Sequence, residues 1–138
     1  MPLKFPSEAW LKALEARLNS DARYAQVARN WEGDLAFVIE PDDSGELDAP
    51  VVFYVDLWHG KCRSSAVLDD IDDKQPSFVL TANLKNYRDI LEGRLDPMQA
   101  MLTRKLKVKG SMAYMMRNVP VVLDFVRVCK EVTQNGEA

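Results

Sequence analysis

The chain has few of the residues on which catalytic and metal-binding motifs depend. Its 138 residues include one histidine and two cysteines, Cys62 and Cys129, which are too far apart to indicate a disulfide framework or a metal site. No Gly-rich phosphate loop follows an expected strand, and there is no Gly-x-Ser-x-Gly motif. We therefore expect neither a metal nor a cofactor.

Long hydrophobic runs are also missing. No apolar stretch approaches the length of about 18 residues that a membrane-spanning helix needs. The first residues lack the basic segment and apolar core of a secretory signal, so a reducing cytoplasm is the expected location. The acidic run 69–74 lacks the Gly and the final Glu of a calcium loop, and we expect a solvated hairpin tip there.

Composition and charge are those of one globular domain covering residues 1–138, with 47% hydrophobic and 28% charged residues. The net charge of −3 is unevenly distributed: residues 1–50 carry 5 basic and 10 acidic side chains, whereas residues 101–138 carry 7 basic and 3 acidic. This balance gives no nucleic-acid footprint. The basic C-terminal third suits transient contact with an anionic membrane surface.

Periodicity and capping residues predict an α+β fold. A mainly antiparallel sheet with helices packed on one side follows from the short links between the elements. Pro120 either kinks the last helix or starts a new one after Asn118. The expected helices are 7–18, 21–31, 83–91, 97–102 and a last region from 111, and the expected strands are 35–39, 51–58, 61–68, 77–81 and 105–110.

Methionine is concentrated in one part of the chain. Five of the six methionines fall between Met98 and Met116, on two expected helices that flank one strand. Methionine is flexible and polarizable, so such a cluster suits a surface that repacks around different apolar partners. Taken alone, a methionine stripe at helical spacing is more often ordinary core.

The same region carries a family resemblance. Residues 91–112 read LEGRLDPMQAMLTRKLKVKGSM, in which a Gly-x-Leu-Asp-Pro helix start and an apolar-x-apolar-x-Gly strand precede a Met-rich helix. This arrangement resembles the sterol carrier protein 2 (SCP2) family, and the resemblance extends from Phe5 to about Val128. The segments 58–62 and 87–93 are similar to a free-standing bacterial and archaeal branch of that family.

The resemblance implies both a fold and a function. Family members have a five-stranded sheet and helices that enclose an apolar tunnel, and they bind fatty acids, acyl-CoA, sterols or isoprenoids without a catalytic residue. The sequence does not show which sheet face looks into the tunnel. By position, the resemblance assigns to the tunnel wall Phe53, Val55, Phe78, Met98, Met101, Leu102, Met112, Met115, Met116, Val119 and Phe125.

Lys105, Lys107 and Lys109 share one face of the expected strand 105–110. A half-exposed strand shows such alternation without any function, and a lysine row also discourages pairing at a sheet edge. The functional alternative is docking on anionic lipid, or attraction of a ligand carboxylate or a CoA phosphate.

The sequence is compatible with three functions. The first is a non-enzymatic intracellular lipid carrier, and the second is an accessory protein that presents a pathway lipid, such as a quinone precursor, to partner enzymes. An exposed apolar patch near a tryptophan would favour the second, and co-purification with enzymes would distinguish it from the first. The third is an enzyme that uses Asp56, His59 and Cys62. Asp56 and Cys62 would lie about 20 Å apart along an extended strand unless the chain turns at Gly60. Hydrogen bonding and core packing explain these residues better.

Overall fold

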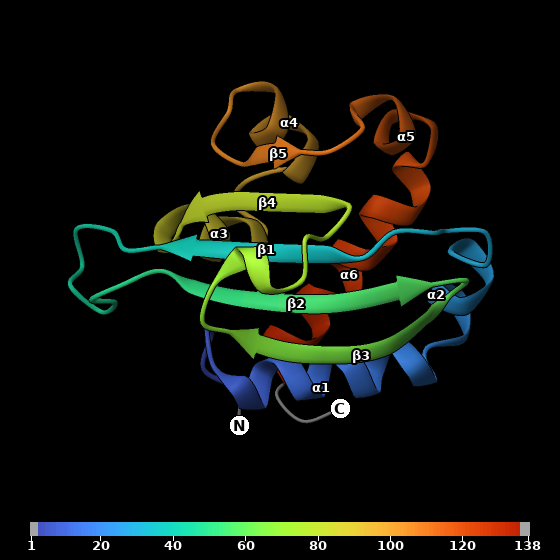
Figure 1. Cartoon of the computed structure of the whole chain (residues 1–138), viewed down its shortest axis with the longest axis horizontal. Helices are drawn as coiled ribbons and strands as arrows, with labels where there is room; N and C mark the ends of the chain where they lie inside the picture. The colour runs from blue at the N-terminus through green and yellow to red at the C-terminus, as the bar shows by residue number, and fades with distance from the viewer. Residues whose placement is uncertain (1–2, 136–138) are drawn as a thin grey trace.

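The computed structural model describes residues 3–135 and contains a five-stranded sheet in the order β3-β2-β1-β4-β5 (Figure 1). The strands are β1 (Leu35–Glu40), β2 (Val51–Trp58), β3 (Lys61–Leu68), β4 (Phe78–Asn83) and β5 (Lys107–Lys109). The pairs β1–β2, β2–β3 and β4–β5 are antiparallel, and β1–β4 is parallel. The sheet is thus mixed, with most of its pairs antiparallel as the sequence predicts.

The prediction of a hairpin tip at residues 69–74 is wrong. β3 does not pair with β4, because β4 lies on the far side of β1. The connection, which includes a 3₁₀ turn η1 (Ile71–Asp73), crosses the sheet face that the helices leave open (Figure 1). Asp34 fixes its end by accepting hydrogen bonds from the Ser77 N–H at 2.7 Å and from the Tyr54 hydroxyl at 2.8 Å. The turn residues between β3 and β4 do not determine that β4 pairs with β1 rather than with β3.

Four helices lie behind the sheet in the view of Figure 1 or beside it: α1 (Glu8–Ser20), α2 (Ala22–Val27), α3 (Leu84–Leu91) and α6 (Val119–Asn135). Ser7 caps α1 and Asp21 caps α2, each accepting a backbone N–H three residues ahead, which satisfies a donor that the first helical turn leaves free. α2 is shorter than predicted, since the chain turns after Ala28 and buries Trp31.

Two short helices flank β5 at one edge of the sheet (Figure 1). α4 (Pro97–Leu102) begins with Pro97 at a first-turn position, where its missing N–H costs nothing, and Asp96 caps it. α5 (Met112–Arg117) is capped by Ser111. Asn118 ends α5, and α6 starts at Val119, so Pro120 lies in the first turn of a new helix and does not kink a continuous one.

The core lies between the helices and one face of the sheet. Alternate residues of β1 and β2 point to that face: Leu35 and Phe37 lie opposite Val55 and Phe53, and all four are buried. Phe5, Trp10 and Phe53 form an aromatic group beneath α1, with ring centroids 4.7 to 6.2 Å apart. The structure therefore decides which face of β2 is internal, a point that its apolar sequence leaves open.

Candidate functional site

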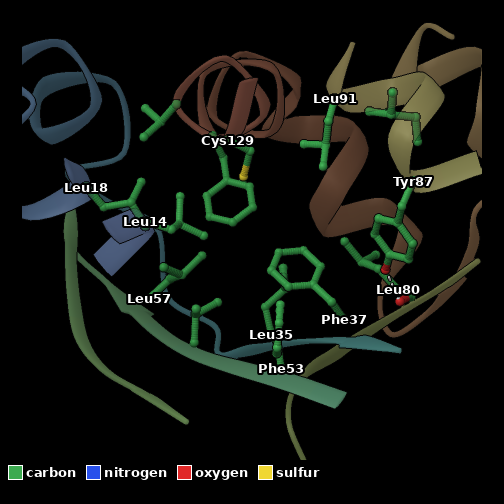
Figure 2. Close-up of a cluster of buried hydrophobic side chains, with 14 of the residues drawn as sticks. Leu14, Leu18, Leu35, Phe37, Phe53, Leu57, Leu80, Tyr87, Leu91 and Cys129 are labelled. Carbon is green, nitrogen blue, oxygen red and sulfur yellow. Dashed lines mark hydrogen bonds between the residues drawn. The ribbon is translucent and has the colours of Figure 1, made fainter. Parts of the chain in front are cut away.

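An apolar cavity of about 60 Å³ lies between the core face of the sheet and α6. Its floor is made by Leu35, Phe37, Leu57 and Leu80. Figure 2 shows Leu91 and Cys129 pointing from the helices toward Leu35 and Phe37 across this space. The floor requires the mixed sheet, because Leu80 of β4 is brought beside Phe37 by the parallel pair.

The roof of the cavity is one face of α6. Val121, Val122, Phe125, Val126 and Cys129 line it, and their spacing of three to four residues is that of a single helical face. Phe125 stacks on Phe37 with ring centroids 5.9 Å apart, so the roof and the floor touch at this point.

The walls come from the other five helices and from segments between the elements. α3 supplies Tyr87, Ile90 and Leu91, and the short helices α4 and α5 supply Met101 and Met115. The remaining aromatic wall residues come from the N-terminal segment, α1, α2 and the turn after α2: Phe5, Trp10, Tyr24 and Trp31.

The few polar atoms in this wall are poorly suited to chemistry. The Tyr87 hydroxyl donates a hydrogen bond to the Leu80 carbonyl, and burial raises its pKa well above the ordinary value. Burial likewise raises the pKa of the Cys129 thiol, which therefore stays protonated and unreactive at neutral pH. What the cavity offers a ligand is apolar contact.

A sequence model described as the SCP-2 sterol transfer family matches residues 11–122, which is most of the chain. The chain belongs to this family. The match spans the stretch from α1 into α6 and so includes most of the elements that line the cavity. No curated protein sequence matches the chain.

Solved structures agree with this assignment to the SCP-2 family. A crystal structure of sterol carrier protein 2 is 32% identical, covers 93% of this chain and 98% of its own, and superposes with a TM-score of 0.84. A conserved hypothetical protein from Thermus thermophilus, described as possibly a sterol carrier protein, is 32% identical, with coverages of 94% and 90% and a TM-score of 0.83. The Aedes aegypti sterol carrier protein 2 in complex with palmitate shares the fold at 19% identity, with coverages of 91% and 98% and a TM-score of 0.57.

The residues that the SCP2 resemblance assigned to the tunnel occupy three kinds of position. Met101, Met115 and Phe125 line the cavity. Phe53, Val55 and Phe78 are buried in the core cluster around it but do not line it. The other five are likewise absent from the wall: Met98, Leu102, Met112, Met116 and Val119.

The length of α4 and α5 explains this division. Each has six residues, less than two turns, and so turns only part of its surface inward. Met101 and Met115 face the cavity, whereas Leu102 is 75% exposed and Met116 is 45% exposed. The positions of the methionines in the sequence do not distinguish the cavity-facing side of α4 and α5 from the solvent-facing side.

Sequence reasoning missed most of the aromatic wall. Trp10, Tyr24, Trp31, Phe37 and Tyr87 line the cavity, and four of them lie outside the Met-rich region and its flanking helices. In the sequence, Trp10 follows the helix-capping residue Ser7 at helical spacing, as Tyr24 follows the capping residue Asp21. These signals predict burial but not proximity to a cavity.

The chain turns at Gly60 and brings Cys62 on β3 beside Leu57 on β2, but the side chains of the possible catalytic group do not pair with one another. Asp56 accepts two hydrogen bonds from Arg63, each 3.0 Å long, and His59 contacts Glu32, with 2.6 Å between Nε2 and Oε2. Cys62 is buried on the core face, where burial raises its pKa to about 12. Each residue has a separate structural partner, and no nucleophile–base pair results.

The tryptophans give limited support to a partner-docking patch. Trp10 and Trp31 are buried and line the cavity, whereas Trp58 is partly exposed. Polar groups lie beside the exposed Trp58 ring, since His59 stacks on it and the Arg63 guanidinium lies 4.8 Å from its ring centroid. Within residues 3–135, no helix is long and apolar enough to cross a membrane.

Proposed function

We propose that this chain is a non-enzymatic carrier that binds one single-chain apolar lipid, such as a fatty acid or a fatty acyl group, between α6 and the sheet. The observation that carries the proposal is the cavity, which is lined by apolar side chains in a chain of the SCP-2 sterol transfer family. The palmitate complex of the Aedes aegypti protein, which has the same fold, supports the ligand class.

The cavity is too small to hold a fatty-acyl chain without a change in its walls. At about 60 Å³ it is smaller than the cavity of about 150 Å³ that holds one benzene in an engineered protein. A fatty-acyl chain therefore requires the wall to move, extending the cavity into a tunnel. The short helices α4 and α5 are the wall elements best suited to move, because each has less than two turns.

Burial of apolar surface would provide the binding energy. Each buried CH₂ contributes about 0.8 kcal/mol before the costs of ordering and wall displacement. Among residues 3–135, no charged side chain lines the cavity, so selectivity would depend on length and shape more than on a headgroup. A broad set of fatty acids, with the carboxylate held outside, is the expected cargo of a cytoplasmic carrier.

The direct test is native mass spectrometry of the purified protein, followed by solvent extraction and identification of the bound compound. Fatty acids at about one per chain support the proposal. A single quinone or isoprenoid species would instead favour the accessory-protein alternative. A bare protein that also fails to bind a fluorescent fatty acid would overturn the proposal, and the methionines would then be ordinary core.

Two variants at one position connect this result to the cavity. Cys129→Phe fills the space under α6, and we expect fluorescent fatty-acid affinity to fall at least about ten-fold. Cys129→Ala removes the thiol but leaves the space, and affinity should stay within about two-fold of wild type. Thermal melts of both variants establish that they are folded. Equal affinities for the two variants would place the ligand elsewhere.

A further inference from the structure

The edge of the molecule formed by α4, β5 and α5 combines exposed apolar side chains with positive charge. Leu102 on α4 and Met112 and Met116 on α5 are exposed. Met112 and Met116 are four residues apart and so lie on one side of α5. Figure 1 shows α4, β5 and α5 together at the same edge of the sheet. We call this region the α4–α5 edge.

The charge of the α4–α5 edge has one sign. Between Pro97 and Leu123 the sequence has five basic residues and no acidic residue. Within residues 3–135, none of the five forms an ion pair, unlike most of the arginines elsewhere in the structure. The five are Arg104, Lys105, Lys107, Lys109 and Arg117, and all are exposed.

Protection of the sheet edge explains only part of this charge. β5 is an edge strand, and Lys107 and Lys109 lie opposite Thr81 and Val79 of β4. Val108, between them, lies opposite Leu80 and packs against the core. Lysines at these positions discourage edge pairing. Arg104, Lys105 and Arg117 lie outside β5 and so cannot protect its edge from pairing with another strand. The exposed Met112 and Met116 are on a helix and are likewise not explained by edge protection.

The α4–α5 edge and the cavity share the same helices. On α4, Met101 lines the cavity and the next residue, Leu102, faces solvent. On α5, Met115 lines the cavity and Met116 faces solvent. A membrane that contacts the outer faces of α4 and α5 would therefore lie close to the side chains that line the cavity.

We infer that the α4–α5 edge docks on an anionic phospholipid bilayer, with Leu102, Met112 and Met116 entering the interface and the basic residues contacting lipid phosphates. Apolar side chains surrounded by unpaired lysine and arginine are the combination that binds such a surface. This inference rests on the proposed function, because docking here places the helices that line the cavity against the source of the ligand.

Vesicle partitioning of the full chain tests the inference. We would use phosphatidylcholine vesicles with about one third phosphatidylglycerol, and pure phosphatidylcholine as reference. At low salt, wild type should bind the anionic vesicles and K107Q/K109Q should bind about twenty-five-fold more weakly, which is about five-fold per lysine. The control R29Q/K61Q removes the same charge from α2's end and from β3, and should bind within about two-fold of wild type.

A second pair of variants tests the apolar contribution. L102S and M116S should each weaken partitioning by several-fold at low and at high salt, because apolar insertion is not screened. The control V67S alters an exposed valine on β3, at the opposite edge of the sheet, and should have no effect. Partitioning that is unchanged in K107Q/K109Q and in L102S would overturn the inference, as would equal losses in the controls. Self-association of K107Q/K109Q with unchanged partitioning would show that the lysines only protect the edge.

Fatty-acid binding in vesicle-free solution separates the two proposals. All of these variants should bind a fluorescent fatty acid like wild type, since none of the substituted residues lines the cavity. If the wild-type chain binds the fatty acid but does not bind the anionic vesicles, the docking inference is refuted and the proposed function is unaffected. Absence of fatty-acid binding in the wild type would refute the proposed function.

Discussion

The Tyr114 hydroxyl of α5 accepts a hydrogen bond of 3.0 Å from the backbone N–H of Glu32, which follows α2. Its ring also packs against Trp31, with centroids 5.0 Å apart, and against Phe78 at 6.0 Å. Tyr114 therefore fastens a short helix of the cavity wall to a distant part of the chain. Tyr114 does not itself line the cavity, so loss of this hydrogen bond would make α5 more mobile without changing a cavity-lining side chain.

Tyr114→Phe should loosen α5. The variant keeps the aromatic packing and loses one hydrogen bond, so we expect a loss of about 1 kcal/mol in the free energy of unfolding. Cys129 should also react faster with a thiol reagent, because its exposure requires the wall to open. The measurement uses a Cys62→Ala background, in which Cys129 is the sole thiol. An unchanged labelling rate would show that α5 does not control access.

Gly60 provides a steric prediction with a close control. Its φ is +80°, and a Cβ there would lie 2.7 Å from the Ala25 carbonyl oxygen. Gly93 has φ +83° but open space around the same position. Gly93→Ala should cost about 1 kcal/mol for backbone conformation alone. Gly60→Ala should cost at least about 2 kcal/mol more in urea unfolding, because the backbone of α2 must move. Equal costs would mean that the hairpin between β2 and β3 is free to shift.

Arg127 on α6 should be a centre of stability. It donates hydrogen bonds to Asp21 at 2.8 Å and to Asp124 at 2.8 Å, and it also contacts Glu131. Asp124 is buried, so removal of Arg127 leaves its carboxylate with Arg23 as its remaining ion-pair partner. Arg127→Met should lower the free energy of unfolding by about 2 kcal/mol at neutral pH. A loss below about 0.5 kcal/mol would place these ion pairs among ordinary surface pairs.

The same contacts predict a pH dependence. The hydrogen bond from Arg127 holds the pKa of the Asp21 carboxyl below its ordinary value. A carboxyl with a lowered folded-state pKa stabilises the fold above its unfolded pKa of about 3.9, and this contribution is lost as the pH falls through the folded value. In Arg127→Met, where this cause is removed, the loss due to Asp21 should begin near the same unfolded-state pKa, be smaller, and be complete at a higher pH. Urea titrations between about pH 2 and pH 7 measure both curves.

His59 should have no part in ligand binding. Its pair with Glu32 is exposed on both sides, and such pairs contribute about 0 to 1 kcal/mol. His59→Ala should keep fatty-acid affinity within about two-fold of wild type and unfold at nearly the same urea concentration. A large loss of binding would restore the Asp56–His59–Cys62 region as a functional candidate.

The sequence predicts the local elements of this fold well and their assembly less well. The caps at Ser7, Asp21 and Asp96 act within one helical turn, so the sequence alone locates these helix starts. The pairing of β4 with β1 depends on contacts between residues far apart in the chain, such as Ser77 with Asp34. No local pattern encodes that choice.

The candidate site shows the same limit. Met101 and Met115 were identifiable from methionine clustering and the family resemblance, and both line the cavity. Leu102 and Met116 have the same character but face outward, since helix rotation around the core is fixed by packing rather than by composition. Trp31 reaches the wall only because the chain turns after α2, which its apolar spacing did not predict.

The parallel pairing of β4 with β1 has a consequence for the order of folding. β1, β2 and β3 are joined by short connections and can assemble early from nearby segments, whereas β4 must close a loop of 43 residues to reach Asp34. Leu80 on β4 completes a floor that Leu35 and Phe37 begin. We therefore expect the cavity to be among the last features to form, with its apolar residues exposed to water until then. A fatty acid present during refolding should act as a template and speed this late step.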